Sequence, residues 1–186
     1  MQKRWTKVIA GILLFSICAS IAGCKRKKKI SFEKLERSTF SIALRDVGIE
    51  AENLVELTTD DSAKYQILTK TFGEGSSYAL LAEYNEMVFS YTEYSSPYFA
   101  HQFFTSYFTM YDDVSRSKKN EEIQTHIEDE FGYVLINYMK GNKQIYGGFY
   151  LIDNTVIVVS NSQSEHVYSD QAFIDKFLGL INYPTP

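Results

Sequence analysis

Apolar side chains recur at helical spacing in three stretches of the chain. The first stretch covers residues 31–47, where Ser31 supplies a capping hydroxyl. The second follows Ser96-Pro97, because serine caps a helix and proline fits its first position. The third begins near Ser169. Each stretch has one apolar side, and the pattern therefore predicts three amphipathic helices.

Between these helices the apolar positions alternate, as in a strand with one buried face. The stretches with this alternation are residues 78–82, 87–92, 133–139, 144–152 and 155–159. Short turns separate the members of each group, which predicts a hairpin at Asn85 and a meander of three strands later in the chain. Residues 65–72 fit either a strand or a short helix capped by Ser62, and a strand is the preferred interpretation.

Hairpin connections favour an antiparallel sheet with helices packed against it. The fold class is therefore α+β, with a largely antiparallel sheet and about three packed helices. No linker rich in proline, glycine or serine interrupts the chain after Ile30. Residues 31–186 are expected to form a single globular domain.

The beginning of the chain has a different composition. Lys3, Arg4 and Lys7 precede residues 8–23, a 16-residue stretch without charge. A spanning helix needs about 20 apolar residues, so this stretch is short for one. A basic start, a short apolar core and small residues at its end are typical of a secretory signal peptide.

That apolar core ends in Ser20-Ile21-Ala22-Gly23-Cys24, which resembles the lipobox of bacterial lipoproteins. The resemblance implies removal of residues 1–23, a diacylglyceryl group on Cys24, and a lipid-anchored protein on the extracytoplasmic face of the cell membrane. Cys18 would be removed with the signal peptide, so Cys24 would be the only cysteine left. A single thiol cannot form an internal disulfide. The alternatives are an ordinary signal peptide or an N-terminal anchor helix.

Five basic residues follow that cysteine directly: Lys25, Arg26, Lys27, Lys28 and Lys29. Residues 24–30 are thus interpreted as the lipidated cysteine and a basic tether. Near an anionic bilayer each such charge adds about 1 kcal/mol of attraction, and the alternative role is a solvated spacer. From Ile30 onward 11 basic residues face 23 acidic ones, a net charge of −12. This balance disfavours nucleic acid as a partner, because phosphates would meet a negative field.

Three features of the remaining chain support a second resemblance. They are Gly48-Ile49 after the first helix, the phenylalanine-rich helix after a strand, and the run from Ile152 to Ile157 before the last helix. The body resembles uncharacterised small α+β lipoproteins of low-GC Gram-positive bacteria. This resemblance implies an extracytoplasmic lipoprotein and assigns no functional residue.

Catalytic and metal-binding patterns are not found. His101, His126 and His166 lie far apart, and no pair has the spacing of a zinc site. Residues 128–130 are adjacent carboxylates, which in a strand point to opposite sides. We therefore predict no metal, no cofactor and no catalytic residue.

The candidate ligand site lies in the strand 144–152, where Tyr146, Gly148 and Tyr150 share one side. Two phenols beside a glycine leave a shallow notch for a sugar ring, a peptide or a flat ligand, and Tyr138 on the neighbouring strand is expected to join them. In the alternative, which is preferred, the aromatic rings cover the bare glycine backbone and face a helix.

These observations favour a membrane-anchored extracytoplasmic lipoprotein that acts as a non-catalytic binding or interaction module. The expected partner is an envelope protein, a peptide or a glycan. The competing hypothesis is an extracytoplasmic enzyme whose site is assembled from scattered residues, including His126 and the carboxylates that follow it.

Overall fold

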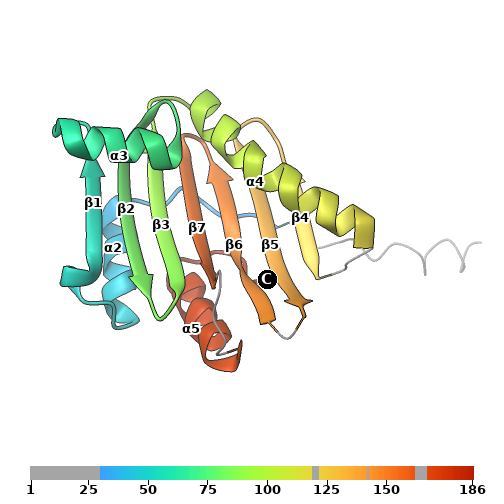
Figure 1. The fold of residues 1–186 in the computed structure, drawn as a ribbon. Coiled ribbons are helices and arrows are strands. Elements are labelled where there is room, and N and C mark those ends of the chain that lie inside the picture. The colour runs from blue at the N-terminus through green and yellow to red at the C-terminus, as the bar shows by residue number, and fades with distance from the viewer. Residues whose placement is uncertain (1–29, 119–121, 142, 162–166) are drawn as a thin grey trace, which may run out of the picture. The chain divides into compact units, whose positions relative to one another are not determined.

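A seven-stranded antiparallel sheet occupies the centre of the fold (Figure 1). The computed structural model describes residues 30–118, 122–141, 143–161 and 167–186. The strands are β1 (Leu54–Thr58), β2 (Ser76–Tyr84), β3 (Met87–Tyr94), β4 (Ile123–Ile127), β5 (Phe131–Lys140), β6 (Lys143–Ile152) and β7 (Thr155–Asn161). Their order across the sheet is β1-β2-β3-β7-β6-β5-β4, and every neighbouring pair is antiparallel.

Helices cover both faces of this sheet. Within the described ranges they are α2 (Arg37–Asp46), α3 (Ser62–Phe72), α4 (Pro97–Lys118) and α5 (Val167–Leu180), with a short 3-10 turn at Ala51–Asn53. The helices α3 and α4 lie on one face, and α2 and α5 lie on the other (Figure 1). The α+β class with a largely antiparallel sheet is therefore confirmed, with one helix more than the sequence predicted.

The first helix is shorter than its apolar pattern suggests. It begins at Arg37, and residues 31–36 are not helical. The reason is tertiary: the Phe32 ring packs against Phe131 and Tyr183, with ring centroids 4.7 Å apart in both pairs. These contacts hold residues 31–36 in a non-helical conformation, although the spacing of their apolar residues is helical.

The preference for a strand over residues 65–72 is wrong. The helix α3 spans this stretch, and its N-cap is Asp61, whose side chain accepts hydrogen bonds from the backbone nitrogens of Ala63 and Lys64. Leu68 and Phe72, four positions apart, are its buried residues. That spacing is helical, and the carboxylate cap decides an ambiguous pattern.

The other helices and strands agree closely with the predictions from the sequence. The helix α4 starts at Pro97, as predicted, and the strands β2, β3, β5, β6 and β7 contain the five alternating stretches. Asn85 and Glu86 both adopt positive φ in the turn between β2 and β3, which matches the twist of a tight hairpin. The two outermost strands, β1 and β4, were not expected from the sequence.

The core has two layers, one on each side of the sheet. Under α4 the buried side chains include Ala100 and Phe104, which pack on Val134 and Leu151 of the sheet. On the opposite face the Phe177 ring of α5 makes an edge contact with Phe40 of α2. Phe32–Pro186 together form one compact unit.

Candidate functional site

Tyr146 and Tyr150 do lie on one side of β6, but their rings are buried. The exposed fractions are 1% and 0%. A Cβ atom added to Gly148 would lie 2.0 Å from the Tyr150 hydroxyl oxygen, so this side chain lies directly over the glycine backbone. The notch expected from the sequence is thus filled by the Tyr150 ring itself.

Both phenols tie β6 to segments from the end of the chain. The Tyr150 hydroxyl donates to the backbone oxygen of Pro184 at 2.6 Å, and the Tyr146 hydroxyl donates to the Asp175 carboxylate of α5. Burial raises the pKa of both phenols. They therefore remain protonated donors and act as structural links.

The expectation that Tyr138 joins this pair is wrong. Tyr138 of β5 lies opposite Ile145 of β6, one position out of phase with Tyr146. Cross-strand partners share a face, and a shift of one residue exchanges the faces. Tyr138 therefore packs in the apolar layer under α4.

The proposed lipidation residue Cys24 and the basic run of residues 25–29 lie outside the described residues. In the part of the chain that the structure describes, no helix is both long and apolar enough to span a bilayer.

His126 and the carboxylate beside it form a surface pair. Its Nε2 atom lies 3.0 Å from Glu128 Oε1, and its ring stacks on Tyr133 with centroids 5.5 Å apart. The side chain of Glu128 is 63% exposed. Among the described residues, no group of three His, Cys, Asp or Glu side chains could hold a metal ion.

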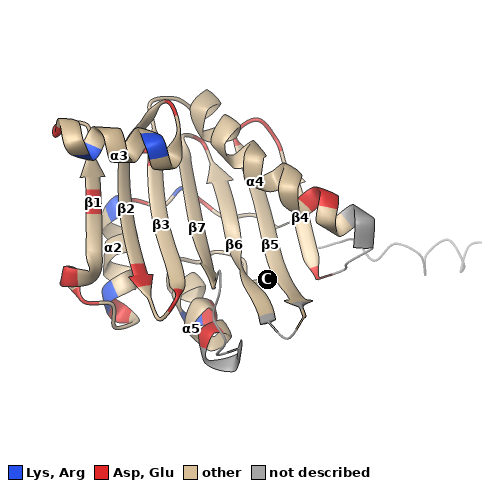
Figure 2. Ribbon diagram, viewed as in Figure 1, with Lys and Arg blue, Asp and Glu red and all other residues tan. Residues whose placement is uncertain are grey.

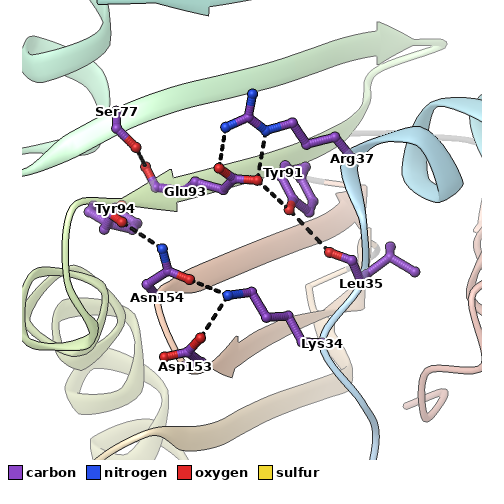
Figure 3. Close-up of polar contacts among 9 residues, drawn as sticks. All are labelled: Lys34, Leu35, Arg37, Ser77, Tyr91, Glu93, Tyr94, Asp153 and Asn154. Carbon is purple, nitrogen blue, oxygen red and sulfur yellow. Dashed lines mark hydrogen bonds and ion pairs between the residues drawn. The ribbon is translucent and has the colours of Figure 1, made fainter.

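Within the described part of the chain, an extensive polar arrangement surrounds residues 32–37, which we call the entry segment because they begin the folded unit (Figure 3). Arg37 Nε donates to Glu93 Oε1 at 2.7 Å, and a second guanidinium nitrogen donates to the other carboxylate oxygen. The Tyr91 hydroxyl lies 2.7 Å from Glu93 Oε1 and 3.1 Å from the Leu35 backbone oxygen. One β3 carboxylate thus receives two side chains and holds the entry segment on the sheet.

Electrostatics agree with this geometry. The hydrogen bond from Arg37 lowers the pKa of the Glu93 carboxyl, and the same bond raises the pKa of the guanidinium. The guanidinium carbon also lies 3.9 Å from the centroid of the Tyr78 ring, a cation–π contact. The ion pair is permanently charged at neutral pH.

A second group of bonds fixes the same segment at the turn between β6 and β7. Lys34 Nζ lies 2.6 Å from Asp153 Oδ2 and also donates to Asn154 Oδ1. Asn154 Nδ2 in turn donates to the backbone oxygen of Tyr94 at 2.7 Å (Figure 3). The entry segment is thereby tied to β3 and to the turn between β6 and β7.

A further phenol reaches the entry segment from the other end of the chain. The Tyr183 hydroxyl donates to the backbone oxygen of Glu33 at 2.9 Å. Glu33 and Leu35 are two positions apart, and each of their backbone oxygens lies within hydrogen-bond distance of a tyrosine hydroxyl. Side chains here replace the hydrogen bonds that a helix or strand would supply.

This arrangement holds the entry segment in place, and the polar atoms that form it are already engaged in bonds with one another. Sequence reasoning missed it because its members come from residues 33–37, β3, the turn before β7 and the C-terminal segment. The only local signal was the spacing of Lys34 and Arg37, three positions apart. That spacing is common on exposed helical faces and does not point to a network.

Comparison with known proteins adds no relative. No protein-family model matches the chain, and no curated protein or solved structure is significantly similar to it.

Proposed function

We propose that the protein is a membrane-anchored extracytoplasmic lipoprotein whose folded domain is a non-catalytic binding or interaction module. The anchor is a diacylglyceryl group on Cys24, at the end of the lipobox-like sequence. The observation that carries the proposal is the fixation of residues 32–37, eight positions further on, by bonds from β3, from the turn between β6 and β7 and from the C-terminal segment.

The anchor and the entry segment together set the height of the domain above the membrane. Two acyl chains supply about 0.8 kcal/mol for each buried methylene, which is enough for stable attachment. An extended chain spans at most about 3.5 Å per residue. The eight steps from Cys24 to Phe32 therefore hold the start of the domain within about 28 Å of the lipid surface.

The use of polar groups supports a module without catalysis. The Glu93 carboxylate is occupied by Arg37 and Tyr91, and the Asp153 carboxylate by Lys34. Catalytic carboxylates act through an accessible oxygen and a shifted pKa suited to proton transfer. A lowered pKa in a saturated ion pair is instead typical of a structural contact.

Metabolic labelling tests the anchor. In a bacterial host that processes lipoproteins, the wild type should incorporate radioactive palmitate and yield a mature product that begins at acylated Cys24. Cys24→Ser should remain unlabelled and unprocessed, whereas Cys18→Ser, the matched control in the signal peptide, should label as the wild type does. Label retained by Cys24→Ser would contradict the proposal.

The basic tether is tested separately. Replacing residues 25–29 by serine should leave the protein with the membrane fraction, because the acyl chains carry the attachment. Release of this variant into the medium would mean that the basic run, and not Cys24, holds the protein.

A further inference from the structure

The two edges of the sheet are built differently. At the β4 edge, α4 donates from Ser115 to the Ile123 backbone oxygen and accepts at Asp112 from the Thr125 hydroxyl. The β1 edge pairs with β2 on its inner side, and no other described strand pairs with it. Its outer row of backbone donors and acceptors is therefore available to a further strand.

Apolar side chains accompany this open edge. Val55, the second residue of β1, is 54% exposed, although Leu57 on the same face is buried under α3. On α3, Tyr65 and Ile67 are also about half exposed, at 47% and 53%. An unpaired strand beside exposed apolar side chains is the arrangement that accepts an extended peptide by strand addition.

The charge at this edge has one sign. Residues 50–61 contain five acidic side chains and no basic one, and all five are exposed: Glu50, Glu52, Glu56, Asp60 and Asp61. Figure 2 shows acidic residues on β1 and at both of its ends. Of the neighbouring bases, Arg37 is paired with Glu93, and Lys64 and Lys70 lie on α3.

This charge argues against a second copy of the chain as the added strand. Antiparallel pairing of two β1 strands about their centre would place Glu56 opposite Glu56 and bring residues 50–52 of one copy to residues 60–61 of the other. Like charges directly opposite one another destabilise a strand pair. A segment that carries lysine or arginine at alternate positions is complementary instead.

We propose that β1 binds an extended, basic peptide segment of a partner protein, which adds to the sheet as an eighth strand. The inference deepens the proposed function, on which it rests, by naming the class of partner. Main-chain hydrogen bonds to β1 provide the affinity. The acidic residues on either side of the strand select a basic sequence, and Val55 contacts an apolar side chain between two basic ones.

The first test uses a synthetic peptide of alternating lysine and valine, with blocked ends and seven residues. The full chain, purified in detergent with its mass confirming an acylated Cys24, is titrated with the labelled peptide. Binding should be at least about tenfold tighter than for a peptide with the same charges whose alternate backbone nitrogens are methylated. N-methylation removes main-chain donors and keeps the charge, so equal binding would overturn strand addition.

The second test locates the site with charge reversals at exposed positions. The edge variant Glu50→Lys/Glu52→Lys/Asp60→Lys should lose at least about tenfold in affinity. The control variant Glu74→Lys/Asp129→Lys/Glu130→Lys changes the net charge equally and should lose less than about threefold. Equal losses in the two variants would overturn the assignment to β1.

Hydrogen exchange gives a readout independent of affinity. Amides of residues 54–58 should gain protection when the lysine–valine peptide binds, while those of β4, residues 123–127, should not change. Protection gained by the amides of β4 alone, or no binding of the peptide by the acylated protein, would overturn this inference and leave the lipoprotein proposal intact. Loss of acylation at Cys24 would instead overturn the proposed function.

Discussion

The two faces of the sheet are closed in different ways. Under α4 the core contacts are between aromatic rings and aliphatic side chains. The ring centroids of Tyr107 and Tyr111, for example, lie 4.8 and 5.5 Å from that of Phe149. On the opposite face, beside the helices α2 and α5, two irregular segments, residues 32–36 and 183–186, also cover the sheet. There Tyr150 and Tyr183 donate to backbone oxygens.

The difference follows from backbone hydrogen bonding. A helix such as α4 satisfies its own peptide groups and packs on this face chiefly through apolar side chains, with side-chain hydrogen bonds of Ser115 and Asp112 to β4. Residues 32–36 and 183–186 have no regular structure, so their buried carbonyls need donors from elsewhere. Tyrosine meets both needs, because its ring packs and its hydroxyl donates. On the α3 and α4 face, the Tyr94 hydroxyl likewise donates to the Phe72 oxygen where α3 ends.

Alkaline pH should have the largest effect, because burial raises the pKa of tyrosines on both faces of the sheet. Burial raises the pKa of Tyr91, Tyr150 and Tyr183 in the folded state, while unfolded tyrosines ionise near 10. Their stabilisation is complete below pH 10 and is lost as the pH rises towards the folded values. Each phenol should remove about 1.4 kcal/mol per pH unit above 10. Urea unfolding at pH 8, 10 and 11 measures this; equal stability throughout would contradict it.

Phe104→Ala tests the ring-packed face. The Phe104 side chain is fully buried in the layer under α4, so the variant should lose about 3–5 kcal/mol of unfolding free energy. Met110→Ala on the same helix removes a side chain that is 50% exposed, and should stay within about 0.5 kcal/mol of the wild type. Urea denaturation measures both. A small loss for Phe104→Ala would show that this face repacks.

Tyr150→Phe isolates the hydroxyl contribution. It keeps the ring but leaves the Pro184 oxygen without its donor, and should cost about 1–2 kcal/mol. Urea denaturation measures this loss. Tyr111→Phe is the control, because among the described residues no hydrogen bond of its hydroxyl is found. Similar losses for both variants would remove the distinction between the faces.

Glu93→Gln should have the smallest effect, about 1 kcal/mol or less at pH 7, because the Arg37 side chain of this ion pair is half exposed. The pKa of Glu93 is lowered, so its contribution is fully present above the unfolded value near 4.3 and is lost as the pH falls from there through the lowered pKa of the folded state. The difference between variant and wild type in urea denaturation should therefore shrink steadily as the pH is lowered below about 4.3. Glu83→Gln, at an exposed position of β2, is the control.

Local patterns explain which elements were predictable. Ser96-Pro97 and the alternating strands carry their signals within a few residues, and both proved correct. Residues 32–36 have a helical apolar pattern but form no helix, because Phe32 packs on distant rings. Tyr138 was placed on the wrong face because strand register, which no local pattern reports, shifts it by one position.

The candidate site was predictable only in part. The alternation along β6 correctly grouped Tyr146 with Tyr150, and the preferred alternative, in which the rings cover glycine and face a helix, agrees with the Tyr150 ring over Gly148 and the Tyr146 bond to α5. The network around the entry segment left only the uninformative spacing of Lys34 and Arg37 in the sequence. Its bonds join residues up to 150 positions apart.

The sequence alone therefore determined the α+β class, most strands, the start of α4 and the expectation of a lipid anchor, because each depends on the order of neighbouring residues. The tertiary structure decided which phenols meet which carbonyls, which face each tyrosine occupies and which strands form the edges of the sheet. These depend on strand order and register, which arise only when segments far apart in the chain pack together.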